Sequence, residues 1–352
     1  MSRLDRYLAF AIFRGISLSL MIIVGLSYVL DFIAEADKIG RPGYGLAEAN
    51  LVTALYMVQR AYEVFPMATL IGALAGLGML ASHGELAVMR ALGKSIGSFA
   101  RVVVLVGVFM GLFATALGEW AAPQAIRYAQ QIETEAQGRD VSFAGQGFWA
   151  RDGDYWLRAE RIPQSDRLDE VRAYEISGGT LRRIITAPTA NFVQGKWSFA
   201  PATVTRFSDS SVDVQNLTMV RLGGELQPQT LDVVVADPWT LAISALYRYV
   251  QYLENNDLKS DEYRLALWLK VSTPLAIVTM LLISLPLIFQ TQRTTGVGQQ
   301  IFLGVLIGLA FFLLNRFLGN VGLVYGLPPA LSALAPTLLF LLIALVALRR
   351  VR

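Results

Sequence analysis

The stretch FPMATLIGALAGLGMLASHGELAVMRALG, residues 65–93, decides how the rest of the chain is interpreted. Its first half ends an apolar run longer than about 20 residues, the length that crosses a bilayer. Its second half turns polar and carries the signals of a separate short helix. Ser82 and Glu85 have the spacing of a capping box, and Gly93 suits a left-handed C-cap. We expect a helix of about ten residues, too short to span a membrane.

The pattern alone leaves two interpretations of this short helix open. It is either a capped turn at the membrane surface or a helix that docks into a partner and transmits movement. Leu86, Met89 and Gly93 share one face, whereas Val88 and Leu92 lie on a neighbouring face. The GKS that begins at Gly93 is not a P-loop, because that motif requires glycine where Val88 stands. We therefore do not expect the chain itself to bind ATP.

The composition is that of a membrane protein. Of the 352 residues, 54% are hydrophobic and only 16% are charged. The chain has no cysteine and one histidine, which excludes disulfides, thiolate metal sites and histidine clusters. Its net charge of +3 fits basic residues that flank membrane spans. The sequence offers no converging acids, bases and nucleophiles, so we expect a non-catalytic protein.

Six apolar runs are long enough to cross a membrane, and they form two groups of three. They cover residues 10–33, 53–80, 96–121, 264–289, 299–318 and 328–348. The first run exceeds the apolar core of a signal peptide, although AEA at 34–36 resembles a cleavage site. The sequence predicts a polytopic α-helical membrane protein with six transmembrane helices.

Basic residues predict the orientation, because they are enriched in cytoplasmic loops. Those that would share one side are Arg3, Arg6, Arg90, Lys94, Arg101, Arg293, Arg349, Arg350 and Arg352. Both termini are then cytoplasmic. The polar segment between the third and fourth spans lies on the opposite side.

That inserted segment has the pattern of a β domain. Its strand-like runs turn at Asp152 and Gly153, at 177–179, and at Gln194 and Gly195, which predicts three hairpins of an all-β sandwich or open roll. An amphipathic helix after DPWT leads back to the membrane. We divide the chain into 1–122 with three spans, 123–260 with the β domain and return helix, and 261–352 with three spans.

Ionisable side chains at the outer ends of the spans are costly and need a partner or a purpose. They are Asp31, Lys38, Arg41, Arg60 and Arg316. Ion pairs or snorkelling explain any one of them, whereas a cluster of the cations would suit an anionic lipid head group.

Three features of the spans have structural interpretations. Ala68, Gly72 and Gly76 recur every four residues, which predicts close helix packing. We interpret Lys270 as a snorkelling residue and GEWAAPQ, 118–124, as a helix terminus with an interfacial tryptophan.

Several blocks together carry a family resemblance. They are LDRYLAFAIF at 4–13, the stretch at 65–93, GEWAAPQ, AISALYRYVQYL at 242–253 and LVYGLPP at 323–329. In these blocks the chain resembles the LptF/LptG family, the permease subunits of a bacterial lipopolysaccharide export ABC transporter, and GEWAAPQ favours the LptG branch. The chain departs from the family at FQTQR, 289–293, where relatives read close to FGPLR, and at Asp31, where some carry lysine.

The resemblance implies a six-helix inner-membrane permease with a periplasmic β-jellyroll inserted after its third helix. Such a subunit pairs with LptF and two copies of the LptB ATPase, with LptC associated and LptA reached through a periplasmic bridge. It takes lipopolysaccharide laterally from the membrane into a cavity between the two permeases. It needs no metal or cofactor of its own.

The resemblance also implies two sets of site residues. The segment 82–93 becomes a coupling helix that meets the ATPase, through Ser82, Glu85, Leu86, Met89 and Arg90. Lys38 lies where a lysine that contacts lipid phosphates is expected, and Arg41, Arg60 and Arg316 are further candidates.

Two alternatives come from other classes of protein. A membrane-anchored periplasmic scaffold would bind partners through the β domain without transport. A secondary transporter is disfavoured, because no acidic or histidine relay lies near mid-membrane.

Overall fold

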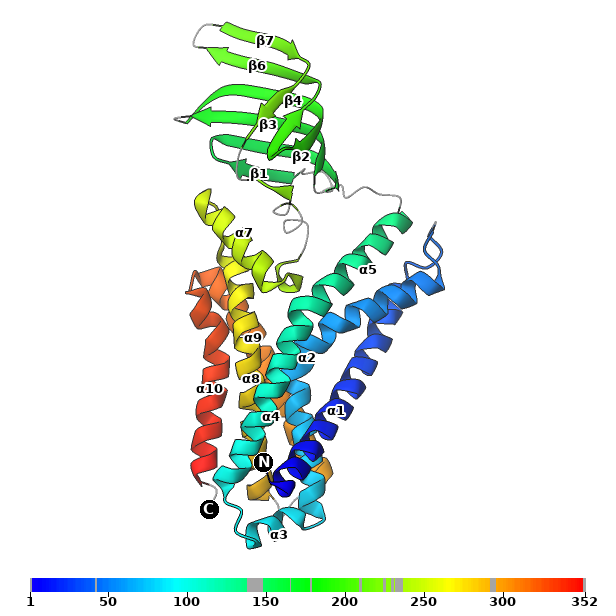
Figure 1. Ribbon diagram of the computed structural model, residues 1–352, viewed down its shortest axis with the longest axis vertical. Helices are drawn as coiled ribbons and strands as arrows, with labels where there is room; N and C mark the ends of the chain where they lie inside the picture. The colour runs from blue at the N-terminus through cyan, green and yellow to red at the C-terminus, as the bar shows by residue number, and fades with distance from the viewer. Residues whose placement is uncertain are drawn as a thin grey trace. The chain divides into compact units, whose positions relative to one another are not determined.

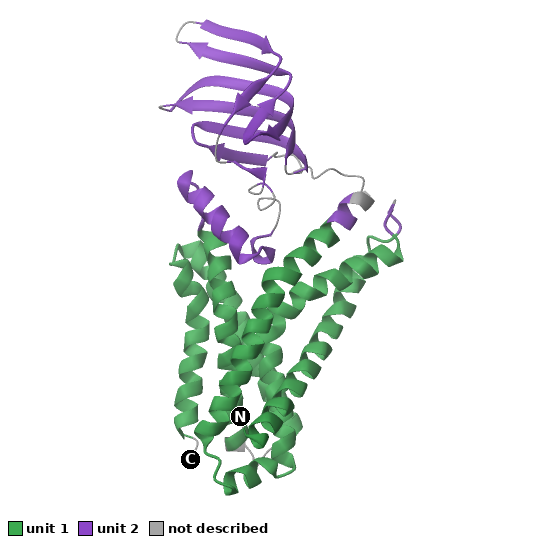
Figure 2. Cartoon of the chain, viewed as in Figure 1, with its two compact units in different colours: residues 1–39, 45–130, 261–352 green, residues 40–44, 131–260 purple. Residues whose placement is uncertain are grey.

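A computed structural model describes residues 2–41, 43–137, 148–164, 166–177, 179–208, 211–223, 226–228, 231, 237–291 and 296–350. The chain forms two compact units (Figure 2). The helical unit comprises residues 1–39, 45–130 and 261–352. The β unit comprises residues 40–44 and 131–260.

The described residues of the helical unit form six helices that are long and apolar enough to cross a membrane (Figure 1). They are α1 (Arg3–Ala36), α2 (Leu46–Ser82), α4 (Ile96–Ala116) with its continuation into α5 (Ala122–Gln137), α8 (Asp261–Thr291), α9 (Val297–Tyr325) and α10 (Pro329–Arg350). The short helix α3 (Glu85–Ala91) lies between α2 and α4, at the same end of the unit as both chain termini (Figure 1). The predicted fold class, a polytopic helical protein with an inserted β domain, is confirmed.

Small residues bring α1 and α2 into close contact. A Cβ built on Gly72 would overlap the backbone of Ile16, and one built on Gly76 would overlap the Ala11 carbonyl. Gly15 of α1 faces Gly72 in the same way. The predicted packing role of this stripe is confirmed, since only glycine lets the two backbones approach so closely.

The third span does not end at GEWAAPQ, and the prediction of a helix terminus there was wrong. The helix passes through a single π-helical turn, η1 (Leu117–Ala121), and continues directly into α5. A π-turn absorbs one extra residue within a helix, so Pro123 is accommodated without a break.

The interpretation of Lys270 as a snorkelling residue was also wrong. Its side chain lies inside the helical unit, 6% exposed, and its ammonium donates a hydrogen bond to the Gly118 carbonyl at 2.8 Å. The ammonium is thus satisfied by protein rather than by the membrane surface.

The described strands of the β unit form one antiparallel sheet of eight strands. They are β1 (Phe148–Asp152), β2 (Tyr155–Gln164), β3 (Arg167–Ser177), β4 (Thr180–Val193), β5 (Lys196–Phe199), β6 (Ala202–Ser208), β7 (Ser211–Leu217) and β8 (Val220–Leu222). β1 to β4 pair in sequence order, and the second edge of β4 is shared between β6 and β5. The sheet therefore forks at β4, with β7 and β8 continuing the two branches.

The core of this unit is built from side chains of one sheet face. Leu157, Ala173, Ile185 and Val204 are in register across β2, β3, β4 and β6, and all are buried. Alternating side chains of a strand point to opposite faces, which is the pattern that predicted the strands. In β5, the indole N–H of the buried Trp197 donates a hydrogen bond to the Leu226 carbonyl at 2.8 Å.

The three predicted hairpins are confirmed, but Asp152 and Ser177, which the prediction placed in turns, are the last residues of β1 and β3. β1 and β2 turn at Gly153 and β4 and β5 turn at Gln194 and Gly195, where all three residues have positive φ. The β3–β4 turn contains Gly179, also with positive φ, while residue 178 lies outside the described residues.

The predicted return helix is α7 (Ile243–Asn255), and it packs on the β1–β2 hairpin within the β unit. The Tyr252 hydroxyl donates to the Arg151 carbonyl at 2.7 Å. The amide oxygen of Asn256 accepts from the Gly153 backbone at 3.0 Å. These bonds tie the end of α7 to the start of the sheet.

Candidate functional site

The ends of α3 are fixed by two glycines. The N-cap is Gly84, with a left-handed φ of 76°, and no side chain caps it. The predicted capping box was wrong: Ser82 belongs to the last turn of α2, where its hydroxyl donates to the Met79 carbonyl at 2.8 Å. Gly93 does end the helix as predicted, with a φ of 86°. The backbone N–H of Lys94 donates to the Met89 carbonyl, which is a Schellman arrangement.

α3 buries one side against the helical unit and exposes the other. Leu86 and Met89 are 1% and 4% exposed and belong to the core of this unit. Val88 and Leu92 are 59% and 72% exposed, one helical turn apart. The apolar face that a partner could cover is therefore made by Val88 and Leu92, which the sequence-based site did not include. Their i, i+4 spacing was the available signal.

Two contacts join the beginning of α1 to the two ends of the α3 segment. Lys94, just after α3, forms a salt bridge of 2.7 Å with Asp5 in the first turn of α1. The Lys94 side chain is only 9% exposed and its ammonium also lies 5.2 Å from the centre of the Phe99 ring. At the other end, the Tyr7 hydroxyl forms a hydrogen bond with the Glu85 carboxylate. The start of α1 thus spans α3 from end to end.

α3 is also connected to α8. The Arg90 guanidinium lies over the Phe289 ring, 5.6 Å from its centre. Phe289 in turn makes an edge-to-face contact with Phe99 of α4, at 5.4 Å between ring centres. Arg90 is therefore a contact between α3 and the bundle, even though it remains exposed.

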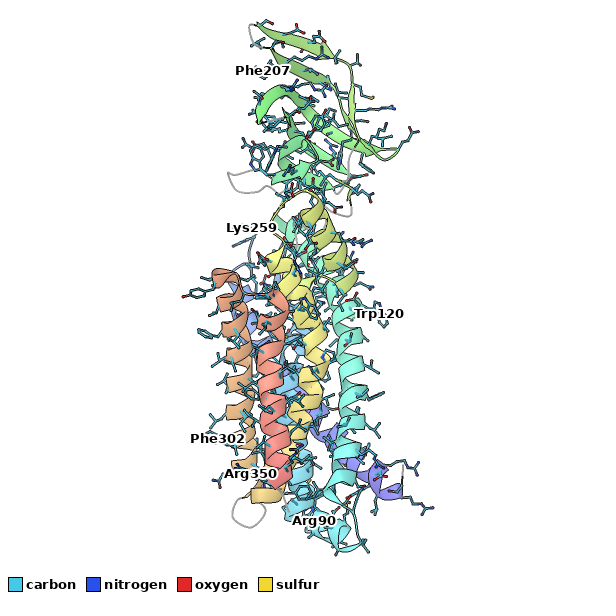
Figure 3. The ribbon with its side chains drawn as sticks, turned by 90° about the vertical axis from the view of Figure 1, so that its left-hand side faces the viewer. Arg90, Trp120, Phe207, Lys259, Phe302 and Arg350 are labelled. Carbon is cyan, nitrogen blue, oxygen red and sulfur yellow. The ribbon has the colours of Figure 1, made fainter. Side chains whose placement is uncertain are left out.

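The end of the helical unit that carries α3 is basic. Arg90 and Arg350 lie at this end (Figure 3), as does the N-terminal turn with Arg3 and Arg6. Arg293 and Arg352 lie outside the described residues. Glu85 is an acidic group within this basic surface, with its side chain 34% exposed and His83 at 4.0 Å.

At the opposite ends of α1 and α2, Arg60 is held by two carboxylates. Its guanidinium contacts Asp31 of α1 at 3.0 Å and Glu63 of α2 at 3.2 Å. Gln59 donates to the other oxygen of Glu63 at 3.2 Å. The local charge of this cluster is negative, so an anionic head group would have to compete with two carboxylates for Arg60.

The other three lipid-site candidates have separate settings. Lys38 forms a salt bridge of 2.9 Å with Glu35 at the end of α1. Arg41 belongs to the β unit, where its backbone forms an isolated antiparallel β-bridge with Tyr44. Arg316 is exposed on α9, and the residue that follows it in sequence, Phe317, is 63% exposed.

Among the described residues, no group of three or more histidine, cysteine, aspartate or glutamate side chains could hold a metal ion.

In the described part of the chain, six helices long and apolar enough to span a membrane, a β unit inserted after the third, and a short surface helix attached to the first and fourth define a polytopic membrane protein with an inserted β domain. A family model described as lipopolysaccharide export system permease LptF/LptG matches residues 6–350. The chain belongs to this LptF/LptG family.

Individual relatives agree along nearly the whole chain. It is 34% identical over 353 residues to the lipopolysaccharide export system permease protein LptG of Escherichia coli strain K12, covering 99% of this chain and 98% of that protein. It is 30% identical to LptG of Haemophilus influenzae over 342 residues, 96% of each chain. LptF of Escherichia coli is 28% identical over 153 residues, 42% of each chain. The LptG branch that the sequence favoured is confirmed as the more similar of the two.

Proposed function

We propose that the chain is the non-catalytic permease subunit of an ABC transporter that extracts lipopolysaccharide from the inner membrane and passes it towards the outer membrane. The observation that carries the mechanism is the attachment of α3 to both α1 and α8. A push on α3 is passed to two spans at once, because packed side chains such as Leu86 and Met89 do not deform continuously.

The partner that pushes is an ATPase of the LptB type, in two copies, one on each permease. Val88 and Leu92 give it an apolar surface, and Glu85, Arg90 and Ser82 lie around that surface. Leu86 and Met89 anchor α3 to the core of the helical unit. Glu85 is the coupling residue, since its carboxylate has two oxygens and can bind a cation of the ATPase while it accepts from the Tyr7 hydroxyl.

The α3 end of the helical unit faces the cytoplasm, together with both termini. The basic side chains at this end support the assignment. The β unit is then periplasmic, and it leads the lipid to LptC and LptA. LptF is the second permease, and we assign the transport cavity to residues 1–122 and 261–352 of this chain with their LptF counterparts.

Lipid phosphates bind Lys38, Arg41, Arg60 and Arg316 in this proposal. Arg316 is the strongest candidate, because it is exposed on a spanning helix, whereas Lys38 and Arg60 form salt bridges with carboxylates. Arg60 contributes only after Asp31 or Glu63 has moved. The affinity of the cavity for the lipid falls when ATP-driven closure makes the bound state less favourable.

Co-purification tests the proposal. The tagged chain should bring down a P-loop ATPase, and a cysteine placed at Leu92 should cross-link to it, with no background from a chain that contains no cysteine. A cysteine at the buried Leu86 is the control that should not cross-link. A periplasmic scaffold would purify without an ATPase, and that result would reject the transporter.

A further inference from the structure

The π-turn of the third span leaves one backbone carbonyl without a helical donor. In η1, the Ala122 N–H donates to Leu117, five residues earlier. The next bond in this register would run to the Gly118 carbonyl from residue 123. That residue is Pro123, which has no N–H. Gly118 is buried, and a buried carbonyl without a donor is costly.

Lys270 of α8 supplies the missing donor. Its ammonium lies 2.8 Å from the Gly118 oxygen and 5.4 Å from the centre of the Tyr62 ring. A lysine side chain at this depth would normally extend to the membrane surface. Here the Lys270 side chain extends from α8 to the third span and donates the hydrogen bond that the π-turn lacks.

Neighbouring side chains fit this arrangement closely. A Cβ on Gly118 would lie 2.6 Å from a Tyr62 ring carbon, so only glycine admits the ring. The Tyr62 hydroxyl is held 3.2 Å from the Thr273 hydroxyl, one turn after Lys270 on α8. Three spans, α2, the third span and α8, therefore meet at Gly118.

Stability alone does not explain a lysine at this position. A buried ammonium is expensive in a membrane-spanning bundle, and an apolar side chain at residue 270 combined with an N–H donor at residue 123 would satisfy the Gly118 carbonyl without that cost. A charged donor on a flexible four-carbon stem can, however, leave and return. Single π-turns inside α-helices are frequent at functional sites, and the loss of such a turn would shift the register of the following helix by one residue.

We propose that the contact between Lys270 and Gly118 is a releasable latch. When closed, it holds the π-turn against α8 and fixes the direction of α5. When open, the turn rearranges and α5 swings relative to α8 and α9. α5 runs directly into the β unit in sequence, so the latch connects the state of the spans to the segment that carries that unit. The proposal rests on the proposed transport cycle for its timing, but not for the closed contact itself.

A backbone rescue tests the closed contact. Lys270→Met should lower the thermal midpoint of the purified chain by several degrees, because it strands the Gly118 carbonyl. Pro123→Ala restores an N–H at residue 123, so the double variant should regain most of the loss. Lys259→Met, the same change at an exposed site (Figure 3), should have no effect. The proposal is wrong if Lys270→Met matches the parent, or if Pro123→Ala gives no recovery.

Spin-label distances test the release. Tyr128→Cys on α5 and Val324→Cys on α9 are exposed labelling sites, and α9 packs against α8 where Gly319 faces Leu265. In the assembled transporter, the parent should show one distance without nucleotide and a second one when trapped with ATP and vanadate. Lys270→Met should show the second distance in both states. A parent distance that is the same in both states, in a preparation that exports lipid, overturns the latch. A preparation that exports no lipid refutes the proposed function instead, and the nucleotide-free comparison still decides the latch.

Discussion

Asp5 and Lys94 form a salt bridge of 2.7 Å that joins the first turn of α1 to the residue that follows the α3 cap. The Lys94 ammonium also lies against the Phe99 ring of α4, so a cation–π contact holds it in place in addition to the salt bridge. Since the Tyr7 hydroxyl meets Glu85 at the other end of α3, contacts to α1 hold both ends of the short helix. The contact thus makes α1 part of the proposed coupling element.

Charge reversal tests this link. Lys94→Asp places two carboxylates side by side, so we expect lipid export to fall several-fold while ATPase binding persists. The double variant Asp5→Lys with Lys94→Asp restores an ion pair and should recover part of the export rate. Export is measured in proteoliposomes. If the double variant is no better than Lys94→Asp, the pair does not act as a link.

The exposed side chains of α3 should contribute to affinity for the ATPase but not to the thermal stability of the chain. Replacing both Val88 and Leu92 with serine should weaken ATPase binding by about tenfold or more, as expected for apolar anchors at an interface. The thermal midpoint of the chain alone should not change, because both side chains are exposed. Leu86→Ala is the opposite case, since a buried leucine costs about 2–5 kcal/mol of unfolding free energy. Equal binding by the serine variant and the parent would contradict the assigned face.

Packing between α1 and α2 should be intolerant of any added side-chain atom at Gly72. Gly72→Ala forces a Cβ into the Ile16 backbone, and overpacking of this kind costs about 1–3 kcal/mol. Gly25→Ala is the matched control on α1, where a Cβ meets nothing within 4 Å. Thermal unfolding in detergent compares them, and a Gly72→Ala variant as stable as Gly25→Ala would show that the helices can separate at no cost.

The lipid-site candidates should differ in how they respond to loss of charge. Arg60→Met leaves Asp31 and Glu63 without their cation, so we expect a lower thermal midpoint and a modest loss of lipid cross-linking. Arg316→Met removes an exposed cation, so cross-linking to lipopolysaccharide should fall with an unchanged midpoint. Photo-cross-linking in membranes separates the two patterns. Unchanged cross-linking in Arg316→Met would remove it from the lipid site.

Features set by local pattern could be predicted from the sequence. The spans follow from apolar length, the hairpins from turn residues, and the Gly93 cap from the need for positive φ. The stripe at Gly72 and Gly76 was interpretable because small residues at four-residue spacing have one common use in helical bundles.

Features set by contacts between distant residues could not be predicted. Arg60 meets Asp31 across 29 positions, and Lys270 meets Gly118 across 152. Local pattern also failed where two signals overlapped. Ser82 and Glu85 match a capping box, but Gly84 between them adopts a left-handed φ and separates α2 from α3. The proline in GEWAAPQ predicted a stop, whereas a π-turn and a lysine from another span let the helix continue.

The number of lipids exported for each ATP hydrolysed tests the central claim, that α3 couples the ATPase to the spans through Glu85. In purified, reconstituted complexes, Glu85→Ala should assemble with the ATPase and hydrolyse ATP, yet export several-fold less lipid per ATP than the parent. His83→Ala, an exposed neighbour, should keep the parent ratio. An unchanged ratio in Glu85→Ala, with intact assembly, would contradict the claim.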